Sequence, residues 1–194
     1  MKPNFIVEVR DLYGNATLAG SINGASFFPK MLKATAGVSR DSVVAFDLKK
    51  VDLVTASFFR AAFMAYRDHA RSAISLYPVI ANANAATKEE AEFFAESAND
   101  ALVFATLTKS GELVDPVLLG KLDDKQEKTL VALVKLKEAD AGRLLEQFPE
   151  KPPVSSAAWS NRLASLAAKG IVVERLEGRT KKYRPILEGI AYGH

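Results

Sequence analysis

The residues with the clearest chemical potential in this sequence are basic side chains near its C-terminal end. Residues 172–185 (VVERLEGRTKKYRP) alternate β-branched and charged residues around a turn through Glu177 and Gly178, which is typical of a two-stranded hairpin. Its second half is strongly basic, with Arg179, Lys181, Lys182 and Arg184. Because lysine and arginine at this density neutralise phosphates, the hairpin predicts contact with a polyanion.

The excess positive charge of the chain lies entirely in its C-terminal part. Residues 1–121 carry 13 basic and 13 acidic side chains, whereas residues 122–194 carry 13 and 10, which accounts for the net charge of +3. Within residues 151–187, eight bases face two acids. A local excess of this kind indicates a nucleic-acid-binding surface, although a run such as Thr-Lys-Lys also occurs on ordinary solvated surfaces.

After Gly120 the sequence predicts three short helices followed by the hairpin. Each helix has capping candidates at its start: Asp123 or Asp124, then Asp140, then Ser155 or Ser156. Apolar residues at helical spacing mark the inner faces, and in the third helix these are Trp159, Leu163 and Leu166. Gly170 is expected to end this helix as a left-handed cap.

The stretch from Ser155 to Tyr183 resembles the recognition helix and wing of winged helix-turn-helix regulators of the MarR/ArsR type. The matching features are the serine-rich helix start, Leu163-x-x-Leu166, Lys169-Gly170-Ile171-Val172, and Glu177-Gly178-Arg179 followed by Tyr183. The resemblance begins near Leu122 and implies an α+β winged helix domain of three helices and a two-stranded wing. One departure is the PEKPPV connection at 149–154, which is longer than a minimal turn.

A winged helix presents the N-terminal residues of its recognition helix to base edges and its hairpin to phosphates. The base-contacting candidates on the exposed side of the helix are Ser156, Ser160, Asn161 and Arg162. The phosphate-contacting candidates are Arg175, Arg179, Lys181 and Lys182. Asn161 can pair with adenine and Arg162 with guanine or a phosphate; Asn161 is equally explained as an ordinary exposed helix residue, while Trp159 and Tyr183 are expected in the fold.

The first half of the chain alternates strand-like and helix-like segments, which predicts an α/β domain with helices on a mixed sheet. Strands are expected at 5–9, 42–48, 75–83 and 101–107, with a short return strand at 16–19. The apolar run at 42–48 is typical of a strand covered on both faces. The segment 111–120 is either an edge strand or the exit from the domain.

Three helices are expected between these strands. The first covers 27–36 and is entered through Pro29. The second follows Ser57, which is its expected N-cap. The third begins at a capping box formed by Thr87 and Glu90.

The segment VVAFDLKKVDLVTASFFRAAF (43–63) resembles the strand-turn-helix signature of STAS domains (sulfate transporter and anti-sigma factor antagonist), with similarity over roughly residues 4–108. In anti-sigma antagonists this turn carries a phosphorylated serine after an aspartate; here Ala56 and Thr55 replace them. Ser57 and Thr55 remain candidate phosphoacceptors because a helix N-terminus stabilises a phosphate. A helix cap and a strand-end hydroxyl explain the same two residues.

Several classes of function find no support in the sequence. The chain has no cysteine, no glycine-rich phosphate loop, and two histidines, His69 and His194, without an assignable carboxylate partner. We therefore expect that the protein is not an enzyme and that it binds neither a cofactor nor a metal ion. No apolar run approaches the ~20 residues of a membrane span, and the first residues lack a secretory signal, so we expect a cytoplasmic protein.

These observations together predict a two-domain, DNA-binding transcriptional regulator. A STAS-like domain (1–121) would serve as the dimerisation, ligand or partner module, and a winged helix (122–194) would bind duplex DNA as part of a homodimer. One alternative is a non-catalytic protein-interaction regulator of the anti-sigma antagonist kind, without direct DNA binding. Another is RNA binding through the same basic surface, which the lack of an exposed aromatic platform disfavours.

Overall fold

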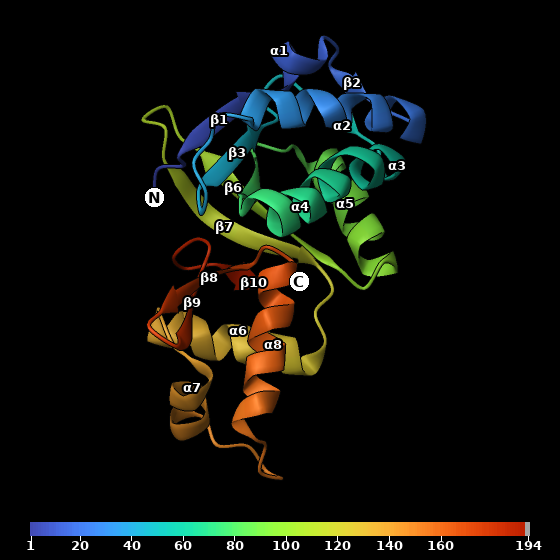
Figure 1. Cartoon of the computed structure of the whole chain (residues 1–194). Helices are drawn as coiled ribbons and strands as arrows, with labels where there is room; N and C mark the ends of the chain where they lie inside the picture. The colour runs from blue at the N-terminus through green and yellow to red at the C-terminus, as the bar shows by residue number, and fades with distance from the viewer. Residues whose placement is uncertain (193–194) are drawn as a thin grey trace.

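The computed structural model describes residues 1–192, and its centre is a mixed six-stranded sheet (Figure 1). The strand order is β1-β3-β5-β6-β7-β10. The first four of these strands are parallel, β7 is antiparallel to β6, and β10 is parallel to β7. Their bounds are β1 Phe5–Glu8, β3 Val43–Asp47, β5 Tyr77–Ala81, β6 Ala101–Leu107, β7 Leu113–Gly120 and β10 Ala191–Tyr192. The predicted α/β class with a mixed sheet is confirmed.

Helices from the first half of the chain cover one face of this sheet (Figure 1). They are α1 (Val9–Tyr13), α2 (Ser21–Thr35), α5 (Ala85–Ser97) and a long helical segment from residue 56 to 74. That segment consists of α3 (Ala56–Phe59), a π-helical turn (Arg60–Met64), α4 (Ala65–His69) and a second π-helical turn (Ala70–Ile74). A two-stranded parallel ladder of β2 (Thr17–Leu18) and β4 (Leu53–Val54) lies beside them.

The C-terminal part contains three helices and a hairpin, in the predicted order. The elements are α6 (Asp124–Leu136), α7 (Ala141–Gln147), α8 (Ser156–Ala168), β8 (Val172–Glu177) and β9 (Thr180–Pro185). Asp123, Asp140 and Ser155 cap the three helices, as their sequence positions predict. Between α6 and α7, Ala139 forms an antiparallel bridge with Tyr183, which ties the first two helices to the hairpin.

The apolar run of β3 explains how the two parts of the chain meet. Successive strand residues point to opposite faces, so Val44 and Phe46 join the helix-covered core while Val43 and Ala45 face the other way. That second face belongs to one continuous apolar cluster with the C-terminal part, including Leu133, and not with helices of the first half. The molecule therefore has three layers: the helices of the first half, the sheet, and the C-terminal part on the second face of the sheet.

The predicted boundary at Leu122 falls in the short link between β7 and α6. Leu122 is itself buried in the shared core, and Ile186, Leu187 and Ile190 return to it after the hairpin. The chain then adds β10 to the outer edge of β7, and the hydroxyl of Tyr192 donates to the carbonyl oxygen of Gly120 over 3.1 Å. The segment 111–120 is thus a strand with neighbours on both sides.

Two predicted elements near the N-terminus differ from the structure. The helix expected at 27–36 begins at Ser21, so Pro29 lies inside it rather than in its first turn. Gly24 is buried in this helix where a Cβ atom would lie 2.9 Å from the Ala61 Cβ, so the glycine permits close helix packing. The short strand near 16–19 pairs with β4 instead of returning beside β1, because α1 intervenes.

Two predicted N-caps are also wrong. The helix expected after Ser57 begins at Ala56, with Thr55 in the N-cap position and no side-chain cap bond. The helix expected at the Thr87 capping box begins at Ala85, and Asn84 accepts the capping hydrogen bond. The hydroxyl of Thr87 instead accepts from the Val54 backbone N–H, so a tertiary contact uses the group assigned to the cap.

Candidate nucleic-acid interface

The helix α8 has the two-sided character that its sequence predicts. The hydroxyl of Ser155 accepts from the backbone N–H of Ala158 over 3.2 Å and fixes the start of the helix. Trp159, Leu163 and Leu166 are buried in the shared core. The opposite side of the first two turns is solvent-exposed and carries three of the base-contacting candidates: Ser156, Ser160 and Asn161.

Arg162, the fourth base-contacting candidate, is placed differently from the prediction. Its side chain is buried, its guanidinium lies 4.9 Å from the Trp159 ring centre, and it forms a two-point ion pair with Glu150, with 3.1 Å between Nη2 and Oε2. The hydrogen bonds to Glu150 raise the pKa of the Arg162 side chain. Arg162 therefore anchors the 149–154 connection to α8 and does not present its guanidinium to a DNA groove.

The hairpin projects beside α8, and the two elements are in contact (Figure 1). Six residue pairs join β8 and β9, from Val172 opposite Pro185 to Glu177 opposite Thr180. The reversal therefore falls on Gly178 and Arg179, and Gly178 adopts the left-handed conformation with φ of +61°. This register places Arg179 at the tip, while Val172 and Tyr183 are buried at the base.

Three other hairpin cations, Arg175, Lys181 and Lys182, have acidic neighbours, whereas for the exposed Arg184 no ion pair is found in the described part of the chain. Lys181 lies 2.8 Å from a Glu174 carboxylate oxygen, and Arg175 lies 3.5 Å from Glu138. Arg175 and Lys181 are exposed, and exposed pairs of this kind contribute little and exchange readily. For Arg179, by contrast, no hydrogen-bond or ion-pair partner is found within residues 1–192. Fewer unpaired positive side chains are therefore available on the hairpin than the number of its lysines and arginines suggests.

Lys182 is held more firmly than the other predicted phosphate contacts. Its Nζ lies 2.6 Å from the carboxylate of Asp140, the residue that caps α7. That hydrogen bond is the main cause of the raised pKa of Lys182, and of the lowered pKa of Asp140. Lys182 thus joins the hairpin to α7, and its contact with a phosphate would require this pair to open.

The C-terminal half of α8 faces a polar pocket of about 540 Å³ between the two parts of the chain. Ala164 and Ala168 line it from α8, and the carboxylates of Asp41, Asp68 and Glu174 line it from neighbouring elements. Arg71 also lines this pocket, and Asp68 and Glu174 are paired with Arg67 and Lys181, so positive and negative side chains alternate along this part of α8.

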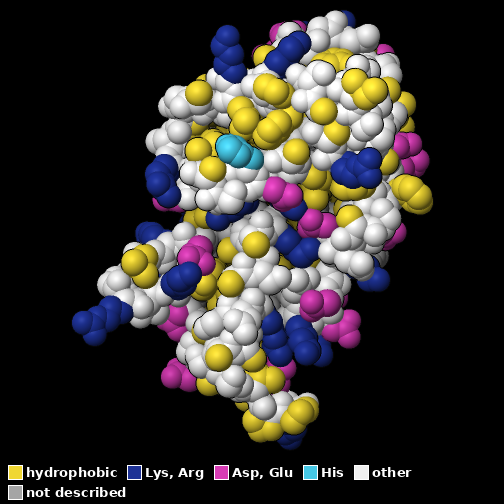
Figure 2. Space-filling view, turned by 45° about the vertical axis from the view of Figure 1, so that its right-hand side comes forward, with side chains coloured by type: hydrophobic (Ala, Val, Ile, Leu, Met, Phe, Trp, Pro, Cys, Tyr) yellow, Lys and Arg dark blue, Asp and Glu magenta, His cyan; other side chains and the backbone are white. Residues whose placement is uncertain are grey.

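A cluster of ion pairs fixes the end of α8 to the first half of the chain. Arg67 on α4 binds Asp100 through two hydrogen bonds of 3.0 and 2.7 Å, and Lys169 reaches the same carboxylate at 3.0 Å. Burial acts to raise the pKa of Asp100, but the hydrogen bonds and charge of Arg67 outweigh it, so the pKa is lowered. Figure 2 shows acidic and basic side chains side by side at the waist of the molecule.

Arg71, one helical turn beyond Arg67, adds a second contact. Its Nε–H donates to the carbonyl oxygen of Ala167 over 3.1 Å, and its guanidinium lies 3.8 Å from the Tyr77 ring centre. Sequence reasoning missed both arginines because their partners are distant: Asp100 lies 33 positions from Arg67, and Ala167 on α8 lies 96 positions from Arg71. The spacing of two arginines on one helix face is the only signal that the sequence offers.

The two candidate phosphoacceptors lie at the start of α3. Ser57 is exposed, and its hydroxyl lies 3.2 Å from that of Thr55. The Thr55 hydroxyl also accepts from the Gly20 backbone N–H over 3.3 Å. The carboxylate of Glu90 accepts from the Ala56 N–H over 2.7 Å, so an anionic group already occupies this helix start. A phosphate on either hydroxyl would meet that carboxylate.

Other features bear on alternative functions. His69 makes an edge contact with the Phe28 ring, and His194 lies outside the described residues. Within residues 1–192, no cluster of metal-binding side chains is found. None of the helices in that range combines the length and apolarity needed to span a bilayer. Searches for similarity find no matching protein-family model and no matching curated protein.

Proposed function

We propose that the protein is a DNA-binding transcriptional regulator that contacts duplex DNA through the first two turns of α8 and the β8–β9 hairpin. One observation carries the proposal: the exposed polar face with Ser156, Ser160 and Asn161 lies beside a hairpin whose tip carries the unpaired Arg179. A helix fits the major groove, and a neighbouring basic hairpin fits the phosphate backbone. The order helix, bridge residue, helix, helix, hairpin supports a winged helix.

The rest of the proposal concerns the first half of the chain and the cellular setting. Its sheet and helices would form the STAS-like module that binds a second copy, a ligand or a regulatory protein. A homodimer on a two-fold site would supply the contact area that one small DNA-binding unit lacks. The protein would act in the cytoplasm, without catalysis.

The salt dependence of DNA binding tests the proposal. With Arg175, Arg179, Lys181 and Lys182 on phosphates, the slope of log affinity against log salt is about −3.6, so affinity falls roughly 100-fold from 50 to 200 mM salt. Arg179→Ala and Lys181→Ala should each reduce the slope by about 0.9 on every sequence. Fluorescence anisotropy with labelled genomic duplexes measures both effects.

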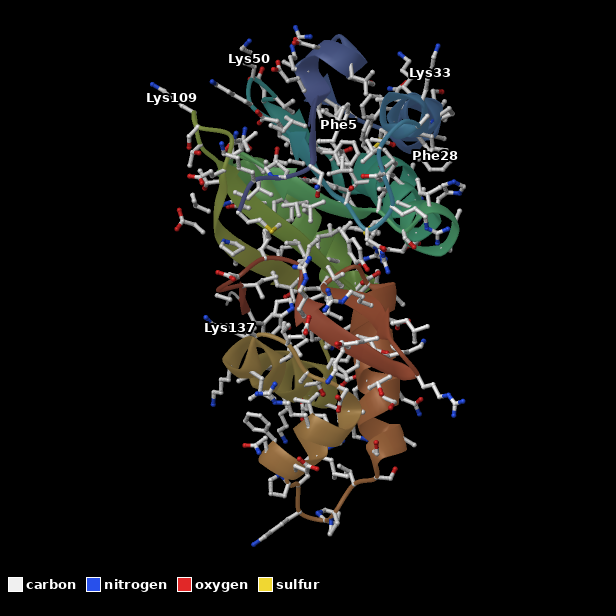
Figure 3. All side chains as sticks on the ribbon, turned by 60° about the vertical axis from the view of Figure 1, so that its left-hand side comes forward. Phe5, Phe28, Lys33, Lys50, Lys109 and Lys137 are labelled. Atoms are coloured by element: carbon white, nitrogen blue, oxygen red, sulfur yellow. The ribbon has the colours of Figure 1, made fainter. Side chains whose placement is uncertain are left out.

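The matched control for these variants is Lys109→Ala. Lys109 is an exposed cation in the β6–β7 turn, at the opposite end of the molecule from the α7 end of the C-terminal part (Figure 3). The Lys109→Ala substitution should leave the affinity for DNA and the salt slope unchanged. Absence of nanomolar binding at low salt for every genomic fragment would refute the proposal, and stronger binding to competitor RNA than to DNA would favour the RNA alternative.

Sequence preference is expected to depend on Asn161. Its exposed amide can make two hydrogen bonds to adenine, and a pair of this kind discriminates against the wrong base by about 1–3 kcal/mol. We expect Asn161→Ala to broaden the set of sequences recovered by selection from random duplexes while preserving the salt slope. An unchanged set of selected sequences would show that Asn161 is an ordinary surface residue.

One observation favours the second candidate function, a protein-interaction regulator without DNA binding. Leu176 on the hairpin is 68 % exposed, and an apolar side chain gains nothing from phosphates. A protein partner would bury it. Co-purification of a stoichiometric partner whose binding survives Arg179→Glu and Lys181→Glu would support this candidate, since those changes abolish phosphate contacts.

A further inference from the structure

The outer face of α5 carries an exposed aromatic ring between two carboxylates. Phe93 is 71 % exposed, which makes it the most exposed aromatic side chain in residues 1–192. Glu89 lies four positions before it and Glu96 three positions after it, so the three side chains project from one side of the helix. Both glutamates are exposed, and neither has an ion-pair partner in that range. An aromatic centre with a charged rim is typical of a surface that binds another protein.

The β8–β9 hairpin offers the opposite charge around an exposed apolar side chain. Leu176, 68 % exposed, stands directly opposite Lys181 in the register of the hairpin, so the two side chains project from the same face. Lys181 shares an exposed ion pair with Glu174, which exchanges readily, and the unpaired Arg179 lies beyond it at the tip. These two cations therefore border Leu176 in the way that the two glutamates of α5 border Phe93.

The two surfaces also match in length. Glu89 and Glu96 are seven positions apart on a helix, which separates them by ~10 Å along its axis. Lys181 and Arg179 are two positions apart at the end of a strand, which separates them by ~7 Å before their long side chains extend. One cation can therefore reach each carboxylate while Leu176 packs on the Phe93 ring.

This contact can form only between two copies of the chain. Phe93 and Leu176 are both largely exposed, so the two surfaces do not cover each other within one copy. The helix α5 and the hairpin lie on opposite sides of the molecule (Figure 1). A surface and its complement at different places on one molecule join copies head to tail. The partner that fits each surface is therefore carried by every other copy of the protein.

We propose that the hairpin of one copy docks on the α5 face of a second copy, with Leu176 on the Phe93 ring and the two hairpin cations on the two glutamates. Arg179 and Lys181 are also residues assigned to phosphate contact, so self-association and DNA binding exclude each other at one hairpin. This exclusion rests on the proposed function, whereas the self-association does not. The assembled form is thus a DNA-free state of the protein.

A charge exchange between two variants tests the proposal by sedimentation velocity at low salt. One variant is Arg179→Glu/Lys181→Glu and the other is Glu89→Lys/Glu96→Lys. The average mass of the wild type should rise with concentration in the micromolar to millimolar range, and each variant alone should lose this rise, because its two surfaces carry like charges. An equimolar mixture of the two variants should regain it. Saturating duplex DNA should abolish the rise for the wild type, and this last result alone depends on the proposed function.

Matched controls separate this contact from general effects of charge and hydrophobicity. Lys33→Glu/Lys109→Glu makes the same change in net charge as the hairpin variant, at two exposed lysines elsewhere (Figure 3), and should leave the self-association unchanged. Phe93→Ala should weaken self-association at least about 5-fold, while Ile22→Ala, at an 81 % exposed position on α2, should have no effect. A wild-type mass that stays constant with concentration, a mixture that does not associate, or equal effects of Phe93→Ala and Ile22→Ala would each overturn the proposal.

Discussion

Asp100→Ala is expected to destabilise the protein by about 3 kcal/mol, because it removes the acid that pairs with two largely buried cations. The side chains of Arg67 and Lys169 are 7 % and 15 % exposed, and both reach the Asp100 carboxylate. Removal of one partner from a buried ion pair leaves uncompensated charge, which costs more than the pair contributed. Urea denaturation of the full chain measures the change.

Asp68→Ala is the matched control for this variant, because Asp68 pairs with the same Arg67 but its side chain is 64 % exposed. Exposed pairs contribute at most about 1 kcal/mol, so its effect should be small. Equal effects of the two substitutions would show that solvent reaches the Arg67 cluster and that it does not fix α8 to the first half of the chain.

The same carboxylate gives stability a defined pH dependence. The pKa of Asp100 is lower in the folded chain than its unfolded value of about 3.9, so the ionised group stabilises the fold above that pH and this contribution is lost as the pH falls through the folded pKa. The difference in unfolding free energy between the wild type and Asp100→Asn should be largest near pH 7 and shrink below pH ~4. A difference that stays constant down to pH ~3 would contradict the ion-pair explanation.

Gly120→Ala is expected to cost about 4 kcal/mol, because two penalties add at the junction of β7 with the C-terminal part. Gly120 has φ of +106°, a conformation that residues with a Cβ atom rarely adopt. An added Cβ atom would also overlap the carbonyl oxygen of Asp100 and lie 2.6 Å from the Ala95 Cβ. Unfolding followed by circular dichroism and by Trp159 fluorescence should show the loss in both parts of the chain.

Gly178→Ala separates the two penalties of Gly120→Ala. Gly178 at the hairpin turn also has a positive φ, of +61°, but an added Cβ atom would meet nothing within 4 Å. We expect a cost of about 1 kcal/mol, the backbone share alone. If the two alanine variants were equally stable, close packing at the β7–α6 junction would not contribute to the fold.

Local signals in the sequence were sufficient for much of the fold. The apolar run at 42–48 corresponds to the fully buried β3, and Asp123, Asp140 and Ser155 cap their helices as expected. These features depend on side chains and backbone groups a few positions apart. The N-caps at Ser57 and Thr87 failed for the converse reason, since contacts with distant segments, such as the one from Thr87 to Val54, determine how those side chains are used.

For the candidate interface too, the sequence was sufficient for some residues and not for others. Helical spacing assigned Trp159, Leu163 and Leu166 to the core and left Ser156, Ser160 and Asn161 exposed. The same spacing gave Arg162 a role in DNA contact, because a helical pattern says nothing about an acid on the preceding connection. Glu150 lies twelve positions away and turns this arginine inward.

The sequence by itself determined most of the strands and helices, where the basic hairpin lies and which side of α8 is apolar, because these properties follow from periodicity and turn chemistry over short distances. It did not indicate α1, β4 or β10. Only the tertiary structure decided that the C-terminal part covers the second face of the sheet, that Arg67, Asp100 and Lys169 hold the end of α8, and that Glu150 pairs with Arg162. Burial and charge pairing depend on residues brought together from distant positions, and a pattern along the chain does not contain those distances.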